Sequence, residues 1–340
     1  MKKSAISCFV YLILISATVR AQYITKYPEI PRIDVHTHVY NNYPAIATYL
    51  VMRDSLMINR KIDMAMWINL GRSNLGETGI DTVTQVSKGR IMTSISDFTP
   101  HKGLRHNSKD LAGYMKKGYV GYKIWYGPPS RVLKEGEKGY KYVDDPANES
   151  TFAAMEKIGM VATSIHIADP NGPFGRRGKW AVDPIEYWRQ IVGMERVLER
   201  HPDLTVIAAH CCWLICQDAQ IDFLRYMLKT YPNFYVDLAA TENYYYLVNR
   251  ENLRDFMIEY SDRIMFGTDK GAIAGTAISS NVNSYARFFQ LLETEDKIEG
   301  RNVMQGLNLP KEVLEKIYYK NAMKLYPGLS DRMRSLGYKI

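Results

Sequence analysis

Short apolar runs alternate with longer amphipathic segments along almost the whole chain, and this alternation constrains the fold more than any other feature. Eight runs have the length and the β-branched content that are typical of buried strands. They are Arg32–His38, Lys61–Ile68, Arg90–Ser96, Tyr119–Trp125, Met160–Ile167, Leu204–His210, Asn233–Leu238 and Arg263–Gly267. Because most of them are followed by a helical segment, the pattern predicts a (β/α)8 barrel, an α/β fold built on parallel strands.

The helical segments carry apolar residues three and four positions apart. They are Pro44–Ile58, Ser108–Lys117, Ala147–Ile158, Pro184–Arg200, Ala219–Thr230, Arg250–Ser261, Tyr285–Leu292 and Pro310–Tyr326. A doubly wound open sheet is the second architecture, but no Gly-rich dinucleotide-binding motif follows the first strand. Since no Pro-rich or Gly/Ser-rich linker divides the chain, residues 22–340 are expected to form one domain.

Residues 1–21 have the pattern of a secretory signal peptide. Lys2 and Lys3 precede an apolar run, and Val19-Arg20-Ala21 resembles a small-x-small cleavage site before Gln22. An uncleaved membrane anchor is the alternative, but the run is short for a transmembrane helix. The sequence therefore predicts an exported protein, periplasmic or secreted outside the cell, with no stable membrane insertion after cleavage.

Charge and cysteine content argue against a nucleic-acid-binding protein and against a fold held together by disulfides. The formal net charge of +8 falls to +5 once Lys2, Lys3 and Arg20 of the signal are removed, and no dense Lys/Arg cluster remains. We therefore expect a small-molecule substrate and no nucleic acid as partner, and a homodimer is compatible with the sequence. Cys211, Cys212 and Cys216 of the mature chain cannot all pair with one another, so buried thiols are favoured over a disulfide framework.

The first predicted strand contains two histidines two positions apart. Alternation in a β-strand would place Asp34, His36 and His38 on one face. Two neighbouring imidazoles can bind one metal ion, although a polar strand end without metal is an equal alternative for an isolated His-x-His.

Later strands end in the same kinds of residue. His166 ends the fifth predicted strand, His210 ends the sixth, and Asp269 follows the eighth. The carboxyl ends of all strands in a barrel surround one opening, so these side chains should meet there. Burying so many polar groups without a function would be costly, and the set therefore predicts a metal site.

The short sequence motifs around these residues are similar to those of a known family. They are Ile33–His38 (I-D-V-H-T-H), His210 in I-A-A-H, Tyr235–Leu238, Phe266–Asp269 and Tyr319–Leu325. Together they resemble the amidohydrolase superfamily, and in particular its amidohydrolase-related branch (amidohydrolase family 2) of metal-dependent TIM-barrel hydrolases. The resemblance extends from about Pro31 to Tyr326.

The resemblance implies a set of roles. His36, His38, His166 and Asp269 would bind a divalent metal, zinc as first choice and manganese as second. The metal would supply bound hydroxide, and Asp269 would move the proton from water to the leaving group. His210 would orient the water or polarise the substrate carbonyl. The implied reaction is hydrolysis of a lactone, carboxylic ester or amide, with non-oxidative decarboxylation as the alternative in the same branch.

One position allows more than one interpretation. Lys123 ends the fourth predicted strand. In two-metal relatives a lysine at this position is carboxylated and bridges the two ions. In one-metal relatives it is an ordinary lysine, which would meet a substrate anion. The sequence motifs around Lys123 favour the one-metal alternative. Asp34 would fix the tautomer of a metal-binding imidazole.

Residues that follow the predicted strands suggest the class of substrate. Lys123, Arg176 and Arg177 suit a carboxylate, and Trp67 and Tyr126 suit a ring. We therefore predict an anionic, ring-containing substrate, bound by these five residues. A further alternative, from another class of protein, is an inactive carbohydrate-binding protein of the cell surface.

Overall fold

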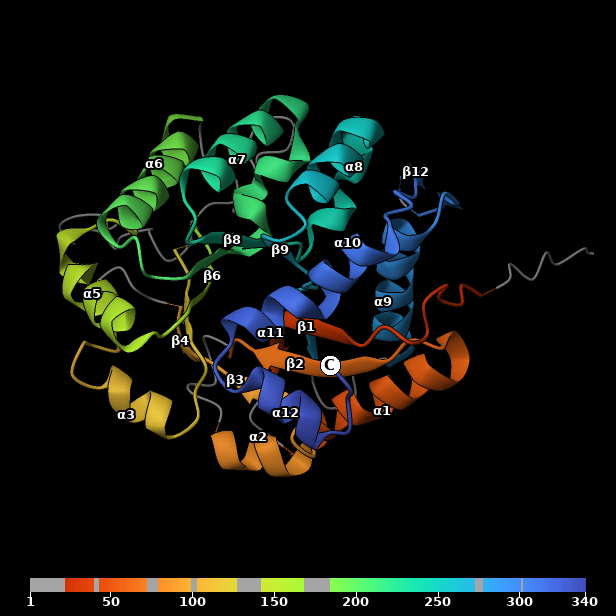
Figure 1. Cartoon of the computed structure of the whole chain (residues 1–340), viewed down its shortest axis with the longest axis horizontal. Helices are drawn as coiled ribbons and strands as arrows, with labels where there is room; N and C mark the ends of the chain where they lie inside the picture. Colours follow the sequence, from red (N-terminus) through yellow and green to blue (C-terminus); the bar gives the residue numbers. More distant parts are fainter. Residues whose placement is uncertain are drawn as a thin grey trace, which may run out of the picture.

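The structure is a computed structural model that describes residues 22–39, 43–71, 79–98, 103–126, 142–167, 184–272, 278–300 and 302–340. Strands occupy its centre and helices surround them (Figure 1). The predicted signal peptide and the predicted substrate residues Arg176 and Arg177 lie outside the described residues. Among the helices that are described, none is both long and apolar enough to cross a lipid bilayer.

Parallel strands follow one another around the centre in the order of the sequence. They are β1 (Arg32–Val39), β2 (Met64–Asn69), β3 (Ile91–Thr93), β4 (Ile95–Asp97), β5 (Tyr122–Ile124), β6 (Ala162–Ile165), β7 (Val206–Ala208), β8 (Phe234–Asp237), β9 (Ile264–Met265) and β10 (Lys270–Ala272). Isolated parallel bridges join the segments of β5 and β6. Because β10 pairs in parallel with β1, the last strand position returns to the first, in agreement with the predicted (β/α)8 fold.

Helices follow the strands, and all eight predicted helical segments are confirmed. The helices are α1 (Tyr43–Arg60), α2 (Ile80–Val86), α3 (Leu111–Lys116), α5 (Glu149–Ile158), α6 (Pro184–Arg200), α7 (Asp218–Thr230), α8 (Arg250–Glu259), α9 (Ile278–Glu293), α10 (Lys311–Glu315), α11 (Asn321–Leu325) and α12 (Leu329–Ser335). Elements outside the predicted segments include α2, α12, strand β10 and a short antiparallel pair, β11 (Lys297–Ile298) with β12 (Met304–Gln305). A π-helical turn, Lys316–Lys320, joins α10 to α11.

Two apolar layers hold the strands in place. One contains side chains from nearly every strand position, such as Ile33, Ile207 and Met265, together with Met333 of α12. The other packs the opposite faces of the same strands, including Trp67, against the surrounding helices. Since both faces of the strands are covered, the strands read as continuous apolar runs in the sequence.

The pairing of β1 with β2 is irregular at two places, between Arg32 and Ile33 and between Asp34 and Thr37, and the second lies at the histidines. Asp34 lies opposite Trp67 and Thr37 lies opposite Asn69, so three steps along β1 match two steps along β2. An extra residue of this kind is a β-bulge, and it reverses which face the following side chains occupy.

Because of this bulge, the prediction that Asp34 shares a face with the two histidines is wrong. The Asp34 carboxylate accepts a hydrogen bond from Tyr285 of α9, in the helix-facing layer. The His36 ring lies instead 2.9 Å from the Asp237 carboxylate at the end of β8. His38 is on the side of His36, because its ring lies edge-on to the His36 ring at 5.4 Å.

Candidate metal centre

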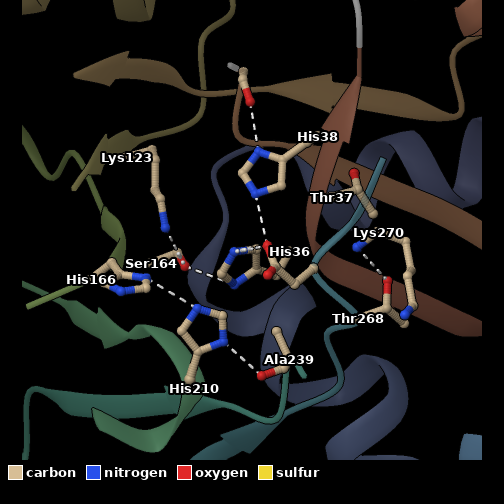
Figure 2. A network of polar contacts seen from close by, with 12 residues as sticks. His36, Thr37, His38, Lys123, Ser164, His166, His210, Ala239, Thr268 and Lys270 are labelled. Carbon is tan, nitrogen blue, oxygen red and sulfur yellow. Dashed lines mark hydrogen bonds and ion pairs between the residues drawn. The ribbon is translucent and has the colours of Figure 1, made fainter. Parts of the chain in front are cut away.

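His36 and His38 present the same ring atom to one carboxylate (Figure 2). The Nε2 atoms lie 3.3 Å and 2.9 Å from Oδ1 of Asp269. Nδ1 of His38 lies 2.6 Å from the carbonyl oxygen of Gly71, which can only accept, so that nitrogen carries the proton. Nδ1 of His36 likewise faces the Asp237 carboxylate. Each neutral ring therefore directs the lone pair of Nε2 toward Asp269, the tautomer that metal-binding histidines need.

Asp269 is brought to the histidines by the backbone. Its peptide nitrogen donates to the carbonyl oxygen of His36 over 2.8 Å, and its φ of +59° turns the chain at this point. Donor atoms of His36, His210 and Asp269 all lie within 4.8 Å of one another. Lone pairs and a carboxylate at such distances repel one another unless a cation lies among them. The donor set consequently fits a divalent metal ion.

The pKa values describe the same need for a cation. Burial opposes the protonated form of His36, yet its contacts with the Asp237 and Asp269 carboxylates together raise the pKa of His36. Burial also opposes the ionised form of Asp269, but His36 and His38 hold the pKa of Asp269 well below its usual range. Both shifts favour positive charge between His36 and Asp269, and a bound metal ion would supply that charge.

His210 is held by three contacts. Its peptide nitrogen donates to Oδ1 of Asp237 over 2.9 Å, its Nδ1 donates to the carbonyl oxygen of Ala239 over 2.6 Å, and its Nε2 lies 3.1 Å from Nδ1 of His166. Burial, with His166 beside it, lowers the pKa of His210 to about 3. His210 is therefore neutral, with its Nε2 lone pair on the side of the site. His166, predicted as a ligand, has its ring centroid 4.9 Å from that of His210, and it is not among the three residues whose donor atoms lie within 4.8 Å of one another.

The backbone at His210 is left-handed rather than extended. The predicted sixth strand was drawn to His210, but β7 ends at Ala208 and residues His210–Trp213 have φ angles of 56°, 51°, 52° and 61°. This conformation costs about 1–2 kcal/mol per non-glycine residue. It carries Trp213 back over His210, where the two rings stack at 4.6 Å. The thiols of Cys211, Cys212 and Cys216 are free and buried, as predicted.

A buried polar chain supports His36 from behind. Ser164, which also has a positive φ of 51°, places its Oγ 2.9 Å from Nδ1 of His36 and donates to the Asp237 carboxylate over 3.0 Å. Lys123 donates to the same Ser164 oxygen over 3.2 Å. Burial works against an ionised Asp237, but the contact with His36 keeps its pKa below the usual range. Asp237 is therefore a fixed anion that orients the His36 ring.

The role expected for Asp34 is wrong in one respect. The tautomers of His36, His38 and His210 are set by Asp237 and by two backbone carbonyl groups, and Asp34 contacts none of these rings. Asp34 accepts instead from the peptide nitrogen of His36. Burial raises the pKa of Asp34 to about 6 in spite of its hydrogen bonds.

The five predicted substrate residues are separated in the structure. Lys123 lies next to the site, where it donates to Ser164 behind His36, and it is only 1% exposed. Trp67 is fully buried between strands and helices, where its ring packs against Tyr49. Tyr126 is also fully buried, and its hydroxyl accepts from the Asn148 amide. The structure does not bring Trp67 or Tyr126 to the donor set, because both side chains face the helix-side layer.

Other residues near the donor set were not predicted. Asp237 and Ser164 belong to strand ends, and the rule that selected the histidines would have selected Asp237 as well. Phe98 follows β4 and lies 6.1 Å from the His38 ring, and Trp125 follows β5 and lies 5.8 Å from the His166 ring. Trp213 required the left-handed turn, for which the sequence offers no glycine as a signal.

Comparisons with known proteins agree with the fold. An uncharacterised TIM-barrel protein from Bordetella bronchiseptica is 16% identical with a TM-score of 0.55, over 89% of this chain and 99% of its own. A 2,6-dihydroxybenzoate decarboxylase in complex with 2,6-dihydroxybenzoate is 14% identical with a TM-score of 0.53, over 87% and 98%. At such identities the likeness concerns the fold. No curated protein matches the chain.

The sequence itself gives the family. Residues 133–328, more than half of the chain, match the model of the amidohydrolase family. The match includes the predicted strand-end residues His166, His210 and Asp269, and also Ser164 and Asp237. The chain therefore belongs to the amidohydrolase family of metal-dependent TIM-barrel enzymes, as the motifs at its strand ends had predicted.

Proposed function

We propose that this protein hydrolyses a carboxylic ester, lactone or amide with the help of a divalent metal ion. The observation that carries this proposal is the meeting of the Asp269 carboxylate with the Nε2 atoms of His36 and His38. Hydrolysis needs a cation site and a carboxylate that can accept a proton from water, and both needs are met in one place.

His36, His38 and Asp269 would hold the metal, with His210 and His166 next in reach. Bound there, a divalent metal supplies Lewis acidity, which makes water more acidic and polarises a carbonyl group. The nitrogen-rich donors favour zinc and leave manganese as the second choice. A second ion would require carboxylation of Lys123, so the number of metals per chain separates the two readings.

Asp269 and His210 would handle the proton and the water. Asp269 is the donor residue that remains most open to solvent, with 37% of its side chain exposed. It can take a proton from water and return it to the leaving group. His210 donates through Nδ1 to Ala239, so its Nε2 offers only a lone pair. We therefore assign it the orientation of water, and not the polarisation of the carbonyl.

The substrate that we propose carries a ring and an anionic group. Support comes from rings that follow one another beside the histidines: His38–Phe98, Phe98–Trp125 and Trp125–His166 have centroids 6.1, 6.1 and 5.8 Å apart. Trp213 and Tyr244 add an edge-to-face pair at 5.5 Å next to His210. Flat apolar walls of this kind suit a planar ring, and the buried Lys123 ammonium suits an anion.

Decarboxylation is the second candidate. One observation favours it, namely the shared fold with a decarboxylase whose ligand, 2,6-dihydroxybenzoate, is a planar anion. In that reaction CO2 leaves the ring and a proton takes its place, and Asp269 is the group in position to supply that proton. An inactive carbohydrate-binding protein remains as the third candidate.

One set of assays separates the three. Purified protein is analysed for bound metal and then incubated with aryl esters, lactones and hydroxybenzoates, while acid release and CO2 release are followed separately. We expect metal near one ion per chain, acid release, and loss of turnover to background in His36→Ala and Asp269→Asn. CO2 release without acid release would favour decarboxylation. A protein that binds neither zinc nor manganese and shows no turnover would leave the carbohydrate-binding reading.

We also propose that the chain is exported and cleaved after Ala21. The support is the basic start, the apolar run and the small residues before Gln22. Mass spectrometry of protein from a secreting host should give an N-terminus at or near Gln22. An intact Met1 in the mature protein would contradict cleavage. Light scattering of the same sample tests the homodimer.

A further inference from the structure

One buried carboxylate connects the two segments that carry the metal donors. Oδ1 of Asp34 accepts the peptide N–H of His36 over 2.9 Å and that of Thr268 over 3.2 Å. Oδ2 accepts the hydroxyl of Thr268 over 2.6 Å. His36 is itself a donor residue, and Thr268 directly precedes Asp269. Asp34 thus holds the backbone on both sides of the contact between His36 and Asp269.

Helix α9 completes this connection from outside the barrel. Tyr285 of α9 donates its hydroxyl hydrogen to Oδ2 of Asp34, and it accepts a hydrogen bond from the indole nitrogen of Trp67 over 3.1 Å. Burial, together with the Asp34 carboxylate, raises the pKa of Tyr285 well above its usual value, so the hydroxyl remains a donor. Tyr285 contacts none of the metal donors directly in the described hydrogen bonds and ring contacts.

The two segments need such a support because neither is a regular strand. The β1 bulge interrupts the ladder between Asp34 and Thr37, and the positive φ at Asp269 interrupts the segment between β9 and β10. Backbone that leaves the ladder loses hydrogen bonds that would otherwise fix its position. Here the missing bonds are replaced by one side chain, Asp34.

We propose that Asp34 and Tyr285 are positioning residues of the metal centre. They act through the peptide groups of His36 and Thr268, and they fix the distance between the His36 imidazole and the Asp269 carboxylate. This inference rests on the proposed metal site. It assigns a role in metal affinity to a residue of α9 that lies behind the barrel strands.

The chain offers a matched control for the test. Tyr318 is also fully buried, and it donates its hydroxyl hydrogen to another buried carboxylate, Glu293, over 3.1 Å. Tyr285→Phe and Tyr318→Phe each remove one such hydroxyl and leave the ring in place. Both should lower the free energy of unfolding, so stability alone does not distinguish a positioning role from a structural one.

Metal affinity does distinguish the two roles. Zinc dissociation constants are measured by competition with a chelator, and the absorption spectrum of the cobalt-substituted protein reports on donor geometry. We expect the dissociation constant to rise about tenfold or more in Tyr285→Phe, as for other groups that orient metal ligands, with an altered cobalt spectrum. In Tyr318→Phe we expect wild-type affinity within about twofold and an unchanged spectrum.

Equal zinc affinities and spectra for the two variants would overturn the proposal. Should Tyr285→Phe fail to fold, Thr268→Val removes the other hydroxyl donor and is measured in the same way. A wild-type protein that binds no metal would overturn both this inference and the proposed function. If the wild type binds zinc but Tyr285→Phe binds it equally tightly, this inference is wrong and the proposed function is unaffected.

Discussion

Asp237 orients two residues of the site at once. It accepts from the His36 ring through one oxygen and from the peptide nitrogen of His210 through the other. Asp237→Asn places an amide where a carboxylate fixed the His36 tautomer, and the amide can turn its NH2 group toward the ring. Loss of such a partner typically weakens metal binding about 10–100-fold. Chelator competition for zinc should reveal a decrease in this range.

Asp222→Asn serves as the control for that measurement. Asp222 is an exposed carboxylate of α7 that pairs with Arg225 on the surface. Its removal changes the net charge equally and should leave zinc affinity unaltered. Unchanged zinc affinity in Asp237→Asn would mean that His36 keeps its tautomer without this carboxylate.

Glu242, next to the site, makes the free energy of unfolding depend on pH. It follows β8 in a short helical turn (Thr241–Asn243) and is only 5% exposed. Burial raises the pKa of Glu242 from 4.5 to about 7, although Lys270 acts in the opposite direction. The folded state therefore holds this proton more tightly than the unfolded state does.

The sign of the effect follows from the raised pKa. The stabilising contribution is complete below about pH 4.5 and is lost as the pH rises through about 7, since an ionised buried carboxylate is unfavourable. In Glu242→Gln this loss, on the order of 3 kcal/mol for a shift of this size, should be absent. Urea unfolding of the metal-free proteins at a series of pH values tests it. Parallel pH profiles for the two proteins would contradict the prediction.

At the level of secondary structure, the contact between β1 and the segment joining β9 to β10 depends on a glycine. A Cβ atom added at Gly267 would lie 3.0 Å from the Cβ of His36 and 3.3 Å from that of Ala239. Gly267→Ala should therefore push His36 away by a few tenths of an ångström. We expect weaker zinc binding and a lower kcat than in the wild type, measured by chelator competition and steady-state kinetics.

Gly113→Ala is the matched control, because a Cβ added at that position in α3 meets nothing within 4 Å. It should leave metal binding unchanged and stabilise the helix by about 0.5–1 kcal/mol. If the two variants bind zinc equally well, the close approach at Gly267 does not position His36.

The strand and helix order could be predicted because each element has a regular hydrophobic period. Pro184–Arg200 was predicted with the bounds observed for α6, and the ligand types at strand ends followed from the geometry of a barrel. The bulge after Asp34 and the left-handed turn after Ala208 could not be predicted. Both depend on tertiary hydrogen bonds and packing that outweigh local preference, and neither contains a glycine. The departures from regular structure thus coincide with the candidate site.

At the level of the whole molecule, a buried ion pair ties the first residue of β1 to the last residue of α9. Arg32 and Glu293 are both fully buried and their charged groups lie 2.9 Å apart. Glu293 also accepts from the hydroxyls of Tyr23, Thr25 and Tyr318. If the signal is cleaved before Gln22, Tyr23 becomes the second residue of the mature protein, so this pair would fix its N-terminus.

Removal of either charge should be far more harmful than removal of both. Glu293→Gln and Arg32→Met each leave a buried charge without its partner, which typically costs about 3–5 kcal/mol. The double variant Arg32→Met/Glu293→Gln should lose less than the sum of the two by about 1–3 kcal/mol, because no uncompensated charge remains. Urea unfolding measures all three free energies.

Asp331→Asn is the control: it breaks the exposed pair with Arg334 and should change the free energy of unfolding by less than about 1 kcal/mol. Additive losses in the double variant would mean that the two charges stabilise the fold independently of each other.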